Sequence, residues 1–146
     1  MNLTDTHAHL YWDSFKEDFD AMLKRTLDAG VSTIINVGVD VDTSKKAVQV
    51  SKKLVLSGVE GYSSIGIHPH EAVNYLIDTD VSIQKDIQQL EQIYLSDTKK
   101  AIAVGECGLD FLFPSPVELD SSASPQNDRI GTATTKDLQR KLFQAQ

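Results

Sequence analysis

Apolar residues along the chain follow two alternating spacings, and the shorter spacing marks β-strands. Four strands are predicted, at residues 3–9, 31–37, 61–67 and 101–105. The second is a run of mainly β-branched residues from Val31 to Val37, which predicts a strand that is buried on both faces. The two-residue period of the first strand gathers four side chains on one side: Leu3, Asp5, His7 and His9.

Helical spacing of apolar residues follows each predicted strand. Ser14 and Glu17 form a capping box that predicts the start of the first helix, and Gly30 is placed to cap its end near residue 29. Asp42 or Thr43 is expected to cap a second helix that ends near residue 56. A third helix is predicted at about 81–95 and a fourth from 134 or 135 onward. The apolar stripes of the first, third and fourth helices are Phe15, Phe19, Met22, Leu23 and Leu27; Ile83, Ile87, Leu90 and Tyr94; and Leu138, Leu142 and Phe143.

Strands that start about 30 residues apart, with a helix between each pair, predict α/β architecture built from parallel βα units. Right-handed crossovers place all the helices on one side of such a sheet, so its other face needs a cover. A closed eight-stranded barrel of about 250 residues provides one. The chain is therefore predicted to be the first half of a TIM (β/α)8 barrel, a single partial domain over residues 1–146 with an uncovered sheet face. That face is a candidate surface for self-association.

Between Phe113 and Thr135 the composition changes to Ser, Thr, Pro and Asp, with few apolar residues. We interpret the segment at about 114–135 as an insertion-like exposed loop.

Composition narrows the class of protein. The 146 residues carry a net charge of −7, so the basic surplus that is typical of DNA-binding surfaces is absent, although bound divalent metals can still attract phosphates. No apolar run is long enough for a membrane helix, and the N-terminus lacks the features of a secretory signal. The lone cysteine, Cys107, excludes an internal disulfide framework and fits a cytoplasmic location, with the nucleus as the alternative in a eukaryote.

Candidate chemistry lies at the predicted carboxyl ends of three strands. His7 and His9 are two residues apart on one strand and can present two imidazoles to one metal ion, or they are incidental polar residues at a strand end. Glu106 follows the fourth strand between Gly105 and Gly108, where a carboxylate can bridge two metals or remain a solvated loop residue. Parallel strands end at one edge, so these groups are expected to converge.

His68 and His70 follow the third strand in the segment GIHPHEA. His68 could contact a phosphate oxygen or polarise a leaving group. His70 could do the same or lie on the surface as a hydrogen-bonded loop residue. We therefore keep both as candidate substrate-binding residues.

Four segments together, DTHAHL, NVGVD, GIHPHEA and GECGLDF, resemble TatD-type deoxyribonucleases in order and spacing. The resemblance covers about residues 1–113 and resumes at about 138–146. It implies a metal-dependent hydrolase on a TIM barrel, related to amidohydrolases, that cleaves phosphodiester bonds in DNA with two divalent ions (magnesium, manganese or zinc). It also implies that His7 and His9 bind one ion, that Glu106 bridges it to a second as a catalytic residue, and that His68 lies where the scissile phosphate binds.

The resemblance has two gaps. The family's remaining ligands, two histidines and an aspartate from later strands, have no counterpart in this sequence, and the family has a shorter connection in place of the segment at 114–135. This chain is thus expected to show little or no activity alone. Two other functions stay open: an amidohydrolase-like enzyme that acts on a small amide or ester, and a non-catalytic truncated product.

Overall fold

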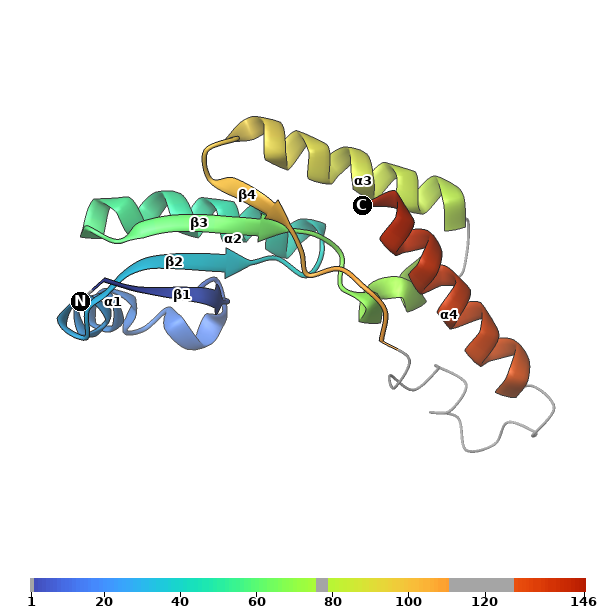
Figure 1. Cartoon of the computed structure of the whole chain (residues 1–146), viewed down its shortest axis with the longest axis horizontal. Coiled ribbons are helices and arrows are strands. Elements are labelled where there is room, and N and C mark those ends of the chain that lie inside the picture. The colour runs from blue at the N-terminus through green and yellow to red at the C-terminus, as the bar shows by residue number, and fades with distance from the viewer. Residues whose placement is uncertain (1, 76–78, 111–127) are drawn as a thin grey trace.

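The computed structural model shows a four-stranded parallel sheet with helices between successive strands (Figure 1). It describes residues 2–75, 79–110 and 128–146, without the side chains of 79 and 128–135. The strands, in the sheet order β1-β2-β3-β4, are β1 (Leu3–Ala8), β2 (Val31–Val37), β3 (Glu60–Ile65) and β4 (Ala101–Val104). All three pairings are parallel, which confirms the predicted arrangement of βα units.

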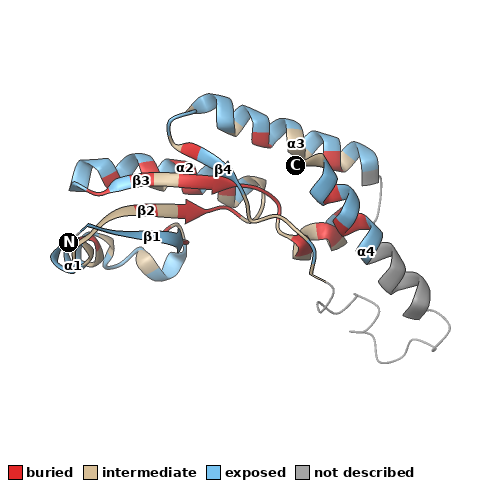
Figure 2. Ribbon diagram, in the orientation of Figure 1, coloured by how far each residue is buried: buried red, intermediate tan, exposed pale blue. Residues whose placement is uncertain are grey.

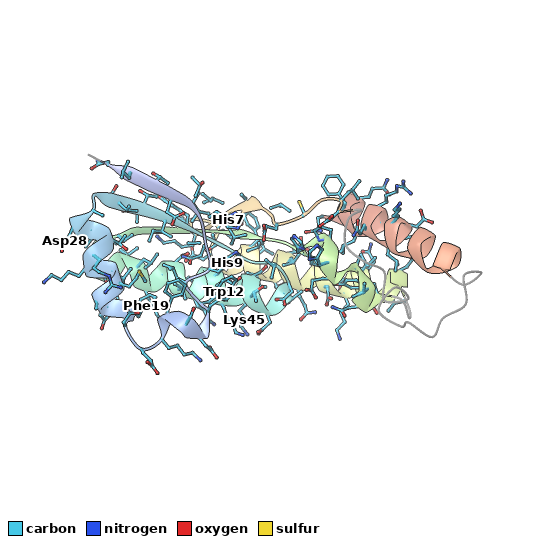
Figure 3. The ribbon with its side chains drawn as sticks, turned by 90° about the horizontal axis from the view of Figure 1, so that it is seen from below. His7, His9, Trp12, Phe19, Asp28 and Lys45 are labelled. Carbon is cyan, nitrogen blue, oxygen red and sulfur yellow. The ribbon has the colours of Figure 1, made fainter. Side chains whose placement is uncertain are left out.

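Four α-helices accompany the sheet: α1 (Phe19–Asp28), α2 (Val41–Leu54), α3 (Thr79–Ser96) and α4 (Asp128–Ala145). Helices α1 and α2 lie on the same side of the sheet, as right-handed crossovers require (Figure 3). Within the described part of the chain, no helix combines the length and the apolar character that crossing a membrane requires.

The capping box predicted at Ser14 is wrong. Residues Asp13–Phe15 form a 3-10 turn, and α1 begins only at Phe19 after Asp18, whose side chain makes no capping hydrogen bond. The end of the helix was predicted correctly, because Gly30 takes a left-handed conformation (φ 85°) and donates its N–H to the carbonyl of Leu27.

The second helix, in contrast, starts earlier than predicted. Its cap is Asp40, whose carboxylate accepts the Thr43 N–H at 2.6 Å while the Thr43 hydroxyl accepts the Asp40 N–H at 2.9 Å. Thr43 is thus the third helical residue of a reciprocal capping box rather than the cap itself.

The fourth helix begins at Asp128 instead of residue 134 or 135, so the part of the predicted loop at 128–135 is helical. Threonines and a glycine make this stretch a weak helix former, which is why composition favoured a loop. The rest of the predicted insertion, 114–127, lies outside the described residues.

Helix α2 packs unusually closely on β2 and β3 through small residues. A Cβ atom at Gly38 would collide with Ser44, and one at Gly61 would collide with the backbone of Ser51. The two serines are fully buried and lie seven residues apart, on the same face of the helix. This close contact holds the ends of β2 and β3 in place.

The opposite face of the sheet is open at both edges (Figure 2). In β1 only Ala8 is buried, and in β4 the side chains of Ile102 and Val104 are 50% and 57% exposed. The first half of β2 is only partly buried, so the expectation of a strand buried on both faces is wrong there. Three side chains of the predicted apolar stripes are likewise well exposed: Leu27, Tyr94 and Phe143.

Candidate functional site

His7, His9 and Glu106 converge at the carboxyl ends of β1 and β4. One ligand atom from each of the three lies within 4.8 Å of the others. The two Nε2 atoms of the histidines are 3.2 Å apart, and Nε2 of His7 is 3.6 Å from Oε1 of Glu106. The expected convergence is therefore confirmed, since the parallel sheet brings residues nearly 100 positions apart to one edge.

The ring of His9 is held in one orientation by the end of β2. Its Nδ1 lies 2.8 Å from the carbonyl oxygen of Val37 and 2.9 Å from the Tyr11 hydroxyl. Because the carbonyl can only accept, this contact favours the tautomer with the proton on Nδ1. The Tyr11 hydroxyl donates to the same carbonyl at 2.8 Å, and Trp12 stacks on the imidazole at a centroid distance of 4.7 Å. This leaves the lone pair of Nε2 directed to His7. The side chains of His7, His9 and Trp12 are labelled in Figure 3.

Burial raises the pKa of the Tyr11 phenol, and the carboxylates of Asp40 and Glu106 raise it further. The phenol therefore stays protonated as a donor to Val37. A proton fixed on Nδ1 by a carbonyl is the usual arrangement for a histidine that binds a metal through Nε2.

Two of the three separations between the donor atoms match those around a divalent transition-metal ion, and the third, between His9 and Glu106, is longer but within 4.8 Å. An ion with ligands about 2.05 Å away in tetrahedral geometry separates those ligands by about 3.3 Å. The observed separations of 3.2 Å between the histidine nitrogens and 3.6 Å between His7 and Glu106 lie close to that value. Two imidazole nitrogens and a carboxylate oxygen also form a donor set that suits zinc or manganese.

Asn36 of β2 fixes the backbone next to the histidine pair by a hydrogen bond. The side chain of Asn36 is fully buried, accepts the N–H of Leu10 at 3.1 Å and donates to the Ser51 hydroxyl at 3.2 Å. Leu10 directly follows His9, so Asn36 connects the candidate ligand to helix α2. Sequence reasoning missed this role, although Asn in a buried strand is a signal for a required hydrogen bond.

Glu106 lies on a turn whose backbone conformation depends on two glycines with positive φ angles. Gly105 and Gly108 have φ angles of 157° and 144°, and the Glu106 N–H donates to the Gly38 carbonyl at 3.0 Å. The peptide bond between Gly105 and Glu106 is cis. The neighbouring Cys107 is a free, half-buried thiol.

His68 and His70 form a second cluster, separate from the first group of possible metal ligands. Nδ1 of His68 accepts the backbone N–H of His70 at 3.2 Å, so the proton of a neutral His68 ring lies on Nε2. Nε2 of His70 lies 2.7 Å from a carboxylate oxygen of Asp110. Asp110 therefore orients a neighbouring side chain. The action of either histidine on a substrate stays a prediction.

A pocket of about 390 Å³ opens beside the histidine pair. Its lining combines Asp5, His7 and His9 with the apolar side chains of Trp12, Phe15 and Met22. Trp12 is 54% exposed although it stacks on His9, which leaves one indole face available to a bound molecule.

Comparison with known proteins identifies relatives over most of this chain. A family model described as TatD related DNase matches residues 4–146. A protein named 3'-5' ssDNA/RNA exonuclease TatD from Musicola paradisiaca is 31% identical over 126 residues, which are 84% of this chain and 42% of that protein. Its namesake from Erwinia amylovora is 28% identical over 111 residues, 76% of this chain and 36% of that protein.

Two solved structures share the fold. A TatD family hydrolase from Entamoeba histolytica has a TM-score of 0.63 at 23% identity, over 95% of this chain and 46% of its own. A TatD homolog from Escherichia coli K12 has a TM-score of 0.59 at 28% identity, over 96% of this chain and 46% of its own. The parallel βα units thus correspond to the first half of a TIM barrel, and the chain spans about two fifths of the length of the curated relatives it matches.

Proposed function

Because this chain belongs to the TatD related DNase family, we propose that it supplies the first half of the active site of a metal-dependent nuclease that hydrolyses phosphodiester bonds in DNA. The observation that carries the proposal is the convergence of His7, His9 and Glu106. The names of the relatives, which are exonucleases of single-stranded DNA and RNA, support the substrate class.

In this proposal His7 and His9 would hold one divalent ion, and Glu106 would be shared between that ion and a second one. Magnesium, manganese and zinc are the candidates. A divalent ion held there would supply stabilisation of charge on phosphoryl oxygens and activation of water. The group of three would give the first ion three ligands, and Glu106 is the one of the three that would also serve the second ion.

His68 is proposed to bind the substrate phosphate. Its Nδ1 is occupied by the N–H of His70, so Nε2–H is the donor that a phosphate oxygen would accept. His70 supports this cluster and is the second proposed substrate-binding residue. The metal ions would supply the positive charge that a chain of net charge −7 otherwise lacks, and the His68 N–H would add a hydrogen bond to the phosphate.

The test is isothermal titration of the 146-residue protein with Mn²⁺, followed by incubation with labelled single-stranded DNA and with a panel of small esters and amides. We expect wild-type protein to bind Mn²⁺ and His9→Ala to lose binding, with DNA cleavage slow or undetectable because the second ion lacks ligands. Robust cleavage that His9→Ala abolishes would support the nuclease and refute the expected low rate. Hydrolysis of a small amide or ester without any DNA cleavage would favour the amidohydrolase-like alternative, and absence of Mn²⁺ binding would refute the metal site.

We also propose that two copies associate through the open sheet face. The two edges of the sheet are β1 and β4, and a two-fold axis along the barrel would pair each β4 with the partner's β1 in the parallel sense of the other strands. The exposed Ile102 and Val104 would then be covered. Since the chain matches 46% of each solved neighbour, two copies would approach the length of one barrel.

Sedimentation of the purified chain tests this association. Ile102→Lys should yield monomers, whereas Leu56→Lys, at a residue that is 89% exposed beyond α2, should leave the dimer unchanged. A wild-type monomer at all concentrations would refute the proposed dimer.

We propose further that residues 1–146 form one partial-barrel hydrolase domain with an insertion at about 114–135, of which 128–135 belong to α4. A cytoplasmic location is proposed on the free thiol of Cys107, which suits a reducing compartment, and cell fractionation tests it.

A further inference from the structure

Two glutamine side chains of α4 each pair with the backbone of a loop next to the site. The amide of Gln139 donates to the carbonyl of Asp110 at 2.9 Å and accepts its N–H at 3.0 Å. The amide of Gln146, directly after the helix, donates to the carbonyl of Ile67 at 3.0 Å and accepts its N–H at 2.7 Å. Each side chain thus satisfies both backbone groups of one residue, as a neighbouring strand would.

The spacing places both glutamines on one side of the helix. They are seven residues apart, close to two helical turns, and the buried Leu142 lies between them. Gln139 is itself only 1% exposed. Apolar contacts such as those of Leu142 hold the helix in place but have no direction, whereas a two-bond amide pair fixes one backbone residue in position and orientation.

The two loops held in this way carry the candidate substrate-binding and metal-binding groups. Ile67 directly precedes His68, and the carboxylate of Asp110 lies 2.7 Å from Nε2 of His70. Glu106 lies in the same segment after β4 as Asp110.

Gly66 is the point at which these parts meet. A Cβ atom there would lie 2.9 Å from the carbonyl carbon of Gly105, 3.0 Å from the carbonyl oxygen of Glu106 and 3.0 Å from Oε1 of Gln146. The strand end before His68, the turn of Glu106 and the amide of Gln146 are therefore packed together around Gly66, with no room for a side chain between them.

We infer that Gln139 and Gln146 are positioning residues, which align the loops after β3 and β4 so that His68, His70 and Glu106 take their working positions. The roles of those three groups rest on the proposed function. The placement by the two glutamines does not, and it is measurable without any activity.

The experiment compares Gln139→Met and Gln146→Met with Gln144→Met, a matched change at an exposed position of the same helix. Amide exchange by NMR reports the clamped N–H groups, and the imidazole signals of His68 and His70 report their surroundings. The absorption spectrum of added Co²⁺ reports the geometry at Glu106 and the two N-terminal histidines. Gln146→Glu is a conservative variant that keeps the acceptor oxygen for Ile67 and removes the donor.

Exchange at Asp110 should become roughly tenfold faster in Gln139→Met, and exchange at Ile67 equally so in Gln146→Met, because each loses a partly buried hydrogen bond. The ring signals of His70 should shift in Gln139→Met, and those of His68 should shift in Gln146→Met. Gln146→Met should also alter the Co²⁺ spectrum. Gln146→Glu should retain the protection of the Ile67 amide, and Gln144→Met should resemble wild type in every measurement. If Gln139→Met does not fold, the two changes at Gln146 decide the inference.

Faster exchange with unchanged histidine signals and an unchanged Co²⁺ spectrum would overturn the inference, because the glutamines would then be purely structural. The same shifts in Gln144→Met would also overturn it. If wild-type protein takes up no Co²⁺, the proposed metal site fails, whereas the histidine signals still decide the role of the glutamines.

Discussion

Replacing Asn36 by Leu should destabilise the chain and weaken metal binding together. Leucine has nearly the same shape, so it leaves no cavity, but it removes the acceptor of the Leu10 N–H and the donor to Ser51. Ser51 keeps its bonds to Tyr62 and Ser63, so the main cost is one unpaired N–H in a fully buried setting. An unsatisfied buried donor costs about 1–3 kcal/mol. For a chain of this size that corresponds to a fall in Tm of roughly 3–10 °C.

Urea unfolding followed by circular dichroism measures the loss, and titration with Mn²⁺ measures the effect on the site. Metal affinity should fall because Leu10 directly follows His9, whose position the lost bond helps to fix. Asn74→Leu is the matched control, since that exposed side chain only bonds to Glu71 at the surface, and it should change stability by less than about 0.5 kcal/mol. Equal stabilities of the two variants would refute the reasoning.

Three further outcomes are expected. Mn²⁺ at about a hundred times its dissociation constant should stabilise the wild-type protein against thermal unfolding by roughly 2.7 kcal/mol and should not stabilise His9→Ala. Equal stabilisation of both proteins would show that the ion binds elsewhere. Gly61→Ala should lower the unfolding free energy by more than about 2 kcal/mol, because its Cβ would collide with the backbone of Ser51, and an unchanged urea midpoint would contradict that collision. Burial and the neighbouring Asp86 raise the pKa of Tyr75 above its ordinary value of about 10. The unfolded chain therefore releases this proton first, so stability should fall as pH rises above about 10, and an equally steep fall in Tyr75→Phe would exclude this cause.

Much of the frame of the site follows from local sequence patterns. The β-branched run makes Val31–Val37 a strand with the predicted bounds. Strand periodicity places His7 and His9 on one side, and the parallel topology that alternating strands and helices require brings Glu106 to the same edge. Gly30 ends the first helix for a purely local reason, since few other residues adopt a positive φ.

Choices between competing local signals were decided by tertiary packing. Ser14 has the residue type of a helix cap, yet α1 begins only at Phe19. The start of α2 is the exception, because a local capping box between Asp40 and Thr43 sets it. Helix α4 extends back to Asp128 although its first residues are weak helix formers. Helix propagation from a segment whose apolar face is already buried outweighs a low local propensity.

The spacing of residue types in the sequence therefore determined which residues reach the edge of the sheet. Only the tertiary structure decided which contacts hold them there. Local periodicity fixes the side of a strand on which a side chain lies, because it depends on the backbone of a few residues. The pairing of His70 with Asp110, and of Gln139 and Gln146 with two separate loops, joins groups 29 to 79 residues apart. No local pattern encodes such partners, since each hydrogen bond exists only once packing has brought distant backbone segments within about 3 Å of each other.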